Sequence, residues 1–453
     1  MKATVFSLLS KISGRDASSE LGVCETITSK EGLWAHQERA LTNLITSAYN
    51  HVPYYHRVFD EVQLVEQGQV YLNRFSSVPL LTKDLIMANW NDLKSRDTTL
   101  GKTHYDRTGG STGQPITLIH DLRYLRWCEA SFLYWYKNFL GIDEIRAKKF
   151  LFWGSPQDLM PTWKARVSGW ARNTISINTH VINQEILSSC IHKINKHKPE
   201  LVRGYAESLY ELSKFALDHS MPINRPQAVV SSAEMLTEEM RATIEQAFGQ
   251  KVFDFYGSRE ISTLAGQCPK GLYHILGFHN LIELLNQSNQ QVKVGETGKV
   301  VVTNLYNYSM PLIRYDIGDL ATLGPDTCQC GSFLPTIAKI NGRTREHFSK
   351  EDGTLISPYV FRLSLISYKW IGDFQVIQED YKRIRIKIVP RGKVVLKDQR
   401  DFEHKIRSLM GKDCIVNWET VNEIPVTPQG KRLRVFTMID KAQRLNNNSE
   451  TNR

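Results

Sequence analysis

The chain has few cysteines and no long apolar run. Seven cysteines among 453 residues is a small and odd number, which argues against the disulfide framework of small secreted domains. No segment stays apolar over the roughly 20 residues that a membrane-spanning helix needs. The apolar start is short because Lys2 and Lys11 bound it, and no small-residue cleavage site follows, so we do not interpret it as a signal peptide. We expect a protein of the reducing cytoplasm without a membrane span.

The chain also lacks a concentrated basic region. Its 57 lysines and arginines exceed its 47 acidic residues and give a formal net charge of +10, but they are spread along the whole sequence. A nucleic-acid-binding protein is expected to show a basic stripe with interleaved aromatic residues. The charge therefore favours an anionic small molecule, or no specific partner, over a nucleic acid.

The composition is that of a globular protein, with 41% hydrophobic and 23% charged residues. The first 75 or so residues have helical spacing. Strand and helix patterns alternate up to residue 255, which predicts a layered α/β core. Strands follow, and a small α+β pattern begins after residue 343. The elements predicted in the alternating region are helices at 123–140, 184–197, 207–219 and 237–248, and strands at 149–153, 227–231 and 251–255.

The segment 108–115, Thr-Gly-Gly-Ser-Thr-Gly-Gln-Pro, is the most distinctive stretch. It holds three glycines and three hydroxyl side chains. Glycines let a backbone approach a ligand closely, and successive exposed N–H groups suit phosphate oxygens. No Gly-Lys-Ser/Thr follows, so the segment is not the common P-loop. A solvated turn is the alternative for this segment taken alone.

Four further motifs follow in order. Residues 255–260, Phe-Tyr-Gly-Ser-Arg-Glu, place an aromatic side chain beside a glycine and a carboxylate suited to Mg²⁺. Residues 311–319 end in Gly-Asp, and 340–343 end in an arginine able to donate to a ribose or phosphate. Residues 425–431 carry a lysine on a Pro/Gly-rich segment. Taken singly, these motifs also fit a strand-end turn, a surface Arg–Asp pair or a solvated lysine.

Taken together in this order, the motifs form a signature. The chain resembles the adenylate-forming superfamily of acyl-CoA synthetases and adenylation domains. More narrowly, it is similar to the phenylacetate–CoA ligase-like branch, which includes CapK-type proteins of capsular polysaccharide biosynthesis. The resemblance covers roughly residues 75–440, including segments 79–83 and 204–205. It implies an α/β fold with a large multi-layer N-terminal adenylate-forming domain (1–343), a small mobile α+β C-terminal domain (344–445) and a disordered tail (446–453).

The resemblance also implies a site for ATP and Mg²⁺. Glu260 would bind Mg²⁺, Asp319 would hold the ribose hydroxyls with support from Arg343, and Lys431 would bridge the substrate carboxylate and the α-phosphate. The residues implied for the β- and γ-phosphates are Thr108, Gly109, Gly110, Ser111, Thr112 and Gly113. Those implied around the adenine are Ser232, Ala233, Glu234, Tyr256 and Gly257.

The implied reaction is attack of a small carboxylic acid on the α-phosphate of ATP, which gives an acyl-adenylate and pyrophosphate. A thiol or amine then takes the acyl group, and the C-terminal domain rotates between the two steps. The expected acceptors are CoA, a carrier protein or a sugar amine. Three positions depart from the family pattern: Gln114 replaces a frequent lysine, Arg259 replaces a threonine, and residues 344–346 lack the usual acidic pivot directly after the Gly-Arg pair.

Those departures keep a second hypothesis open, namely a catalytically impaired nucleotide-binding homologue with a scaffold or regulatory role. The retained Lys431 speaks against it. The sequence leaves the identities of the acid and the acceptor open, and also the oligomeric state.

A separate set of residues predicts a metal site. Cys268, His274, Cys328 and Cys330 offer three thiols and one imidazole, a ligand set that suits a closed structural Zn²⁺ site. The Cys-x-Cys spacing is tighter than in zinc fingers, but some members of the resembled branch have similar positions and a bound metal. Unpaired buried thiols are the alternative.

Overall fold

The computed structural model describes most of the chain in two compact units. The first holds the described residues up to Ile340 and the second those from Asn341 onward. The described residues are 2–107, 116–153, 167, 169–177, 184–343, 348–352, 354–356, 361, 364–365, 368–425 and 434–439. None of the described helices combines the length and the apolar character needed to cross a membrane.

The first unit is built on one 11-stranded sheet, in the order β12-β13-β14-β15-β11-β10-β9-β8-β7-β5-β6. Its parallel half comprises β5 (Lys149–Phe152), β6 (Thr174–Ile177), β7 (Leu201–Tyr205), β8 (Ala228–Ser232) and β9 (Val252–Ser258). The other half comprises β10 (Ser262–Gln267), β11 (Tyr273–Ile275), β12 (Asn280–Leu285), β13 (Thr297–Asn304), β14 (Tyr315–Leu323) and β15 (Thr336–Arg343). Antiparallel pairs join β10 to β9 and β11, β11 to β15, and β13 to β12 and β14.

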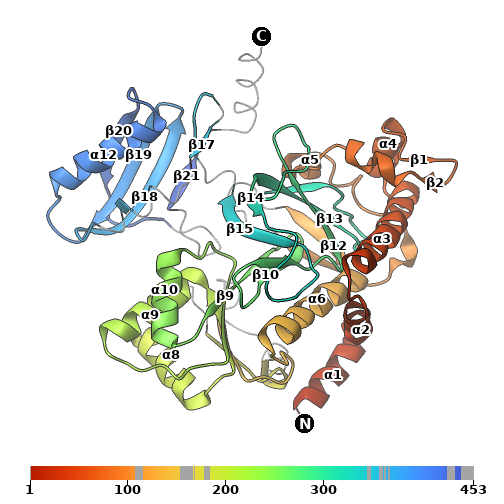
Figure 1. Cartoon of the computed structure of the whole chain (residues 1–453), viewed down its shortest axis with the longest axis horizontal. Helices are drawn as coiled ribbons and strands as arrows, with labels where there is room; N and C mark the ends of the chain where they lie inside the picture. Colours follow the sequence, from red (N-terminus) through yellow and green to blue (C-terminus); the bar gives the residue numbers. More distant parts are fainter. Residues whose placement is uncertain are drawn as a thin grey trace. The chain divides into compact units, whose positions relative to one another are not determined.

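Helices cover both faces of the parallel half (Figure 1). On one face lies α6 (Leu122–Leu140), which begins at the Asp121 cap and ends at Gly141 with φ 66°. On the other lie α8 (Gln184–His197), α9 (Ala206–Asp218) and α10 (Glu238–Phe248). Adjacent strand residues point to opposite faces, so Val229 packs with α8–α10 whereas Val230 packs with α6.

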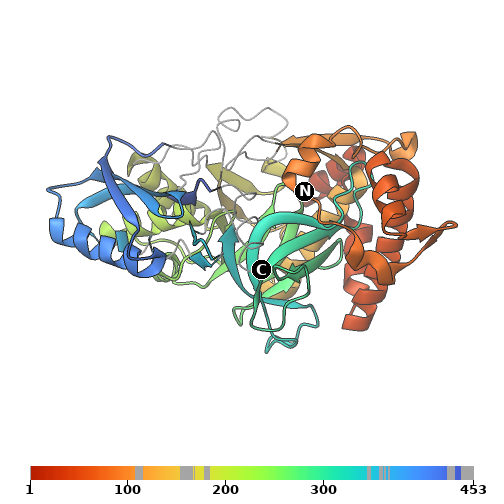
Figure 2. The same cartoon turned by 90° about the horizontal axis from the view of Figure 1, so that it is seen from above.

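The N-terminal helices pack beside the antiparallel half, where Figure 2 shows them in red and orange next to the teal strands. Ser29 caps the longest of them, α3, and Thr82 caps α5. The elements of this region are α1 (Lys2–Ser13), α2 (Ser18–Thr26), α3 (Lys30–His51), α4 (Pro53–Glu61), β1 (Val65–Glu66), β2 (Gln69–Val70), η1 (Leu72–Ser77), α5 (Lys83–Ala88) and η2 (Thr98–Leu100). A separate hairpin of β3 (Thr103–Arg107) and β4 (Thr117–Asp121) leads into α6.

A buried arginine ties the N-terminal segment to the sheet. Arg314 is 2% exposed and forms two hydrogen bonds, at 3.1 and 3.0 Å, to the carboxylate of Glu283. Its other terminal nitrogen donates to the carbonyl oxygens of Ser76 and Val78. All three nitrogens of the guanidinium group therefore have acceptors, as a buried cation requires.

The second unit is a small α+β body. Its four-stranded sheet has the order β20-β19-β18-β21. The buried residues Phe402, Ile406 and Met410 of the helix join the buried isoleucines of β19 in one core. The elements are β16 (Phe348–Ser349), β17 (Leu355–Ile356), β18 (Ile371–Asp380), β19 (Arg383–Pro390), α12 (Leu396–Met410), β20 (Ile415–Thr420) and β21 (Val435–Thr437).

The α/β fold class predicted from the sequence, a large sheet domain with a small C-terminal domain, is confirmed. The helix predicted at 184–197 coincides with α8, and that at 123–140 differs from α6 by one residue. Strands β7 and β10 were not among the predicted elements, and the short β1–β2 hairpin interrupts the region expected to be helical.

Candidate active site

The predicted adenine residues lie where the parallel strands end. Ser232 is the last residue of β8 and pairs in register with Phe255 of β9. Its buried hydroxyl donates to the Phe255 carbonyl oxygen at 2.9 Å. Ligands of open α/β sheets bind at the carboxyl ends of the strands. The edge that carries Ser232 is therefore the natural place for a ligand.

Ala233 and Glu234 form the turn that follows β8. Ala233 has a left-handed φ of 68°, which is uncommon for a residue with a side chain. The Glu234 carboxylate accepts a hydrogen bond from the backbone N–H of Glu207 at 3.1 Å. Glu207 lies in the first turn of α9, whose N-cap residue, Tyr205, makes no side-chain cap. Glu234 thus satisfies a free N–H at the helix start and fixes the turn against α9.

Tyr256 and Asp319 meet inside the first unit. The Tyr256 hydroxyl donates to Asp319 Oδ2 at 2.8 Å, and both residues are buried. Asp319 follows Gly318, whose φ of 81° suits glycine. The pair joins β9 to β14, which are separated in the sheet by β10, β11 and β15. In a flat sheet four spacings of about 4.8 Å would place these strands about 19 Å apart, so the sheet must curve strongly here.

Gly257 permits the tight hairpin between β9 and β10. A Cβ atom at this position would lie 2.3 Å from the carbonyl oxygen of Ser262, so no larger residue fits without moving the backbone. The hairpin carries Glu260, which is half-buried. Close backbone pairing at Gly257 therefore sets where the candidate Mg²⁺ ligand lies.

His120 supports the same hairpin from β4. Its ring makes a hydrogen bond to the backbone carbonyl of Glu260, and burial lowers the pKa of His120 below its usual value. The ring also packs on Tyr124, with centroids 4.6 Å apart. Sequence reasoning missed His120, because a single histidine in a strand has no local pattern that marks it.

Several predicted site residues lie outside the part of the chain that the structure describes. The phosphate-loop residues Thr108 to Gly113, together with Gln114, lie outside the described residues, as do the pivot candidates 344–346 and the lysine Lys431. Arg343 is described as the last residue of β15 and is half-buried.

Cys268, His274, Cys328 and Cys330 come together as one cluster. Their ligand atoms all lie within 4.8 Å of one another. The Sγ atoms of Cys268 and Cys328 are 3.6 Å apart, and Cys330 Sγ lies 3.2 Å from His274 Nε2. The second ring nitrogen, Nδ1, lies 3.1 Å from the Leu334 carbonyl, which requires the proton on Nδ1. His274 Nε2 is then unprotonated and turned towards the thiols, which is the form that binds a metal.

Burial affects the protonation of the cluster. It raises the pKa of Cys268 to about 12, raises the pKa of Cys330 and lowers that of His274. These shifts favour the neutral forms of Cys268, Cys330 and His274 in the free cluster. A bound cation would favour the thiolate forms and release protons.

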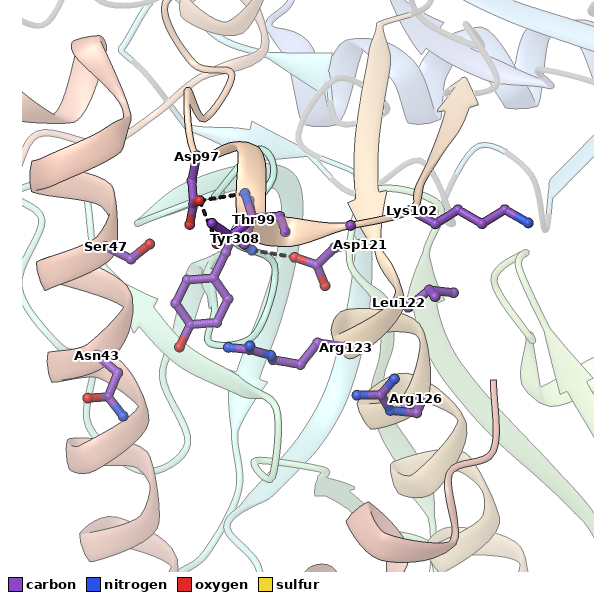
Figure 3. A pocket seen from close by; sticks show the side chains of 12 residues that line it. Asn43, Ser47, Asp97, Thr99, Lys102, Asp121, Leu122, Arg123, Arg126 and Tyr308 are labelled. Atoms are coloured by element: carbon purple, nitrogen blue, oxygen red, sulfur yellow. Dashed lines mark hydrogen bonds between the residues drawn. The ribbon is translucent and has the colours of Figure 1, made fainter. Parts of the chain in front are cut away.

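A separate pocket of about 510 Å³ lies at the end of the β3–β4 hairpin where Thr103 pairs with Asp121 (Figure 3). Arg123 and Tyr308 project into it side by side, with the guanidinium carbon 4.7 Å from the ring centroid. Asp121 lies behind them and accepts hydrogen bonds from the backbone N–H groups of Tyr124 and Tyr308. None of the predicted ATP residues that the structure describes lines this pocket.

Comparison with solved structures identifies the fold. The chain is similar to 2-hydroxyisobutyryl-CoA ligase in the postadenylation state in complex with R3-HIB-AMP, with a TM-score of 0.68, 18% identity, and coverage of 94% of this chain and 93% of that one. It is also similar to O-succinylbenzoate coenzyme A synthetase from Bacillus subtilis in complex with ATP and magnesium ion, with a TM-score of 0.52, 17% identity, and coverage of 73% and 68%. The fold is that of the adenylate-forming CoA ligases.

Sequence comparisons narrow the class to a branch. Residues 348–437 match the model of the CapK C-terminal domain. Protein CapK of Staphylococcus aureus is 24% identical over 80% of both chains. The phenylacetate-coenzyme A ligase of Thermus thermophilus is 24% identical over 70% of this chain and 71% of its own. The resemblance to the phenylacetate–CoA ligase-like branch with its CapK-type proteins is confirmed, and these relatives support an AMP-forming ligase.

Proposed function

We propose that the protein activates a small carboxylic acid with ATP and Mg²⁺ as an acyl-adenylate, releases pyrophosphate, and transfers the acyl group to a thiol or amine. The observation that carries this proposal is the buried Tyr256–Asp319 pair beside the ends of β8 and β9. It places a carboxylate able to accept ribose hydroxyls next to an aromatic ring suited to an adenine.

The roles proposed for the other residues follow from the charge that develops in the reaction. Negative charge gathers on the transferring phosphate, so catalysis there depends on positioning and charge stabilisation. Glu260 is the candidate ligand for Mg²⁺, and Lys431 is the cation that would hold the acid carboxylate against the α-phosphate. The residues 108–113 would bind the β- and γ-phosphates through backbone N–H groups and hydroxyls. Arg343 would support the ribose.

The acceptor is proposed to be CoA, in line with the phenylacetate-coenzyme A ligase relatives. A carrier protein or an amino sugar would suit a role in surface polysaccharide synthesis. The CapK relative and the CapK C-terminal domain match support that setting. The product of the second half-reaction separates the two thiol acceptors from the amino sugar, because a thiol yields a thioester and an amine yields an amide.

The cysteine–histidine cluster is proposed to hold a structural Zn²⁺. In a tetrahedral site with Zn–S about 2.3 Å and Zn–N about 2.1 Å, neighbouring donors of this set lie roughly 3.6–3.8 Å apart. The Cys268–Cys328 distance of 3.6 Å and the Cys330–His274 distance of 3.2 Å are close to that geometry. Cys268 and His274 lie on the β10–β11 hairpin and Cys328 and Cys330 on the turn before β15. The ion would therefore join two segments of the first unit.

The adenylation step is tested by pyrophosphate release from MgATP with a panel of aryl, fatty, hydroxy and amino acids. Lys431→Ala should abolish acid-dependent release without abolishing ATP binding. Lys393→Ala is the matched control, because Lys393 is exposed on a turn of the same unit and its loss should leave the rate unchanged. ATP binding without release for any acid would favour the impaired homologue that Gln114 and Arg259 suggest. Release unaffected by Lys431→Ala would contradict the mechanism.

A further inference from the structure

Aromatic rings surround the guanidinium group of Arg203. This residue lies in β7, and its guanidinium carbon is 4.8 Å from the ring centroid of Phe132, 5.2 Å from that of Trp153 and 5.6 Å from that of Phe255. The three rings come from α6, the end of β5 and β9. Trp153 also packs on Tyr205, with centroids 4.2 Å apart.

The charge of Arg203 has no counter-charge in the described part of the chain. The side chain is half-buried and forms no ion pair with a described residue, and its Nε is fully buried without an acceptor. Its polar neighbour is the buried phenol of Tyr136, which interacts with the guanidinium group through its charge and a side-chain hydrogen bond. The proton of the Tyr136 hydroxyl has no acceptor among the described residues.

Other buried cations of the first unit have acidic partners. Lys149 and Arg172 share the carboxylate of Glu144, at 3.1 and 3.2 Å, and Arg314 is paired with Glu283. Burying a cation without a partner is costly, and the aromatic faces offset only part of that cost. A residue whose burial remains unfavourable to the stability of the folded protein is a candidate for ligand recognition.

Arg203 also lies beside the candidate active site. It is two residues before Tyr205, which pairs in register with Ser232. The Phe255 ring that contacts Arg203 belongs to the residue whose carbonyl binds the Ser232 hydroxyl, and Tyr256 follows directly. Arg203 therefore contacts Phe255, a residue at the strand ends that are proposed to hold the nucleotide.

We infer that Arg203 determines substrate specificity by binding a second carboxylate of the acid, so that the preferred substrate is a dicarboxylic acid. This rests on the proposed adenylation. A guanidinium group binds a carboxylate through two parallel hydrogen bonds, and Tyr136 supplies a further donor. The rings of Phe132, Trp153 and Phe255, which contact the guanidinium group, would offer apolar contacts to the body of the acid beside that carboxylate.

The test compares acids that differ in one charge. Pyrophosphate release is measured with terephthalate against 4-carbamoylbenzoate, and with glutarate against glutaramate, for wild type, Arg203→Met and Arg203→Lys. The wild type should prefer the dianion about 10- to 100-fold in kcat/KM, the range expected for hydrogen bonds to a charged group. Arg203→Met should bring this ratio to about one, mainly through KM of the dianion, and Arg203→Lys should give an intermediate ratio.

Arg123→Met is the matched control, because Arg123 also lies over an aromatic ring, at 4.7 Å, but in the separate pocket. It should leave the ratio unchanged. A wild type that prefers the neutral member of each pair would overturn the inference, as would Arg203→Met lowering the turnover of both members equally.

Failure of the adenylation proposal gives a different pattern. If no acid supports release, calorimetric binding of terephthalate and 4-carbamoylbenzoate to the full chain decides the inference alone. Selective binding of terephthalate that Arg203→Met abolishes would support Arg203 as a carboxylate site while the reaction proposal fails. No selective binding by the wild type would overturn the inference. Should Arg203→Met not fold, as judged by its melting temperature, Arg203→Lys carries the same comparison.

Discussion

The hydroxyl of Tyr256 donates to Asp319 across a 2.8 Å distance, although their strands are not neighbours in the sheet. The bond fixes the orientation of a buried carboxylate. Because such a carboxylate is proposed to accept the ribose hydroxyls, this relationship is the most direct place to test the nucleotide site.

Tyr256→Phe should raise the KM for ATP about fivefold with little change in the KM for the acid, because one hydrogen bond of about 1 kcal/mol is lost from the carboxylate. Initial rates of pyrophosphate release at varied ATP measure this. Tyr210→Phe, which removes a hydroxyl on α9 that only weakly contacts Glu239, should have no effect. A change confined to the KM of the acid would contradict the ribose assignment.

The cysteine–histidine cluster predicts one zinc per chain. Elemental analysis should find about one equivalent in the purified wild type and much less in Cys268→Ala. Chelation should lower the melting temperature of the wild type because the ion joins two segments of the first unit. Cys190→Ala controls for the loss of a buried thiol outside the cluster. Because burial raises the pKa of Cys268 to about 12, zinc affinity should increase with pH. A full zinc content in Cys268→Ala would exclude this site.

Asp254 predicts a pH dependence of stability. Burial raises the pKa of this carboxyl from 3.8 to about 6, against the lowering effect of the Tyr273 hydroxyl that donates to it at 2.6 Å. The folded state binds the proton more tightly than the unfolded chain, so the stabilisation is complete below about pH 4 and is lost as pH rises through 6. A shift of roughly two pKa units corresponds to about 3 kcal/mol.

Asp254→Asn cannot ionise, so its melting temperature should fall less than that of the wild type between pH 4.5 and 7. Differential scanning calorimetry of both proteins over that range measures the difference. Parallel pH curves for the two proteins would show that Asp254 titrates normally in the folded state.

The Arg314–Glu283 pair predicts a large stability effect at one position. Arg314→Met leaves a mostly buried carboxylate and two backbone carbonyls unpaired, which should reduce the free energy of unfolding by about 3 kcal/mol or more. Arg57→Met, which breaks the exposed pair with Asp92, should cost less than about 1 kcal/mol. Urea unfolding measures both. The double variant with Glu283→Gln should be less destabilised than the sum of the single variants, and full additivity would show that the pair is not coupled.

Local patterns were enough to predict the helices of the parallel half. The apolar spacing in α8 and the glycine that ends α6 are signals contained within the elements themselves. Strand β7 was missed because Arg203 and Gly204 break its apolar run. Its place in the middle of the parallel half comes from β5 and β8 on its two sides, which no local pattern records.

The same limit applies to the candidate site. The sequence motifs identified Ser232, Tyr256 and Asp319 as site residues. The contact between Tyr256 and Asp319, however, depends on a sheet that curves so that β9 approaches β14. Arg203 and His120 are single residues, and their roles become visible only from what surrounds them. The sequence predicted the residues of the cysteine–histidine cluster because cysteines are few and the resembled branch has similar positions, and not because their spacing is diagnostic.

The second unit fixes the chain on both sides of segment 426–433, which lies outside the described residues and carries Lys431. The buried residue Ile424 anchors the chain before the lysine, and Val435, paired with Val376 of β18, anchors it afterwards. In the sequence Lys431 stands four positions before Val435, and four residues of fully extended chain span at most about 14 Å. We therefore expect an insertion or deletion within residues 426–433 to change the reach of the proposed catalytic lysine directly, whereas substitutions elsewhere in the unit can do so only by moving the two anchors.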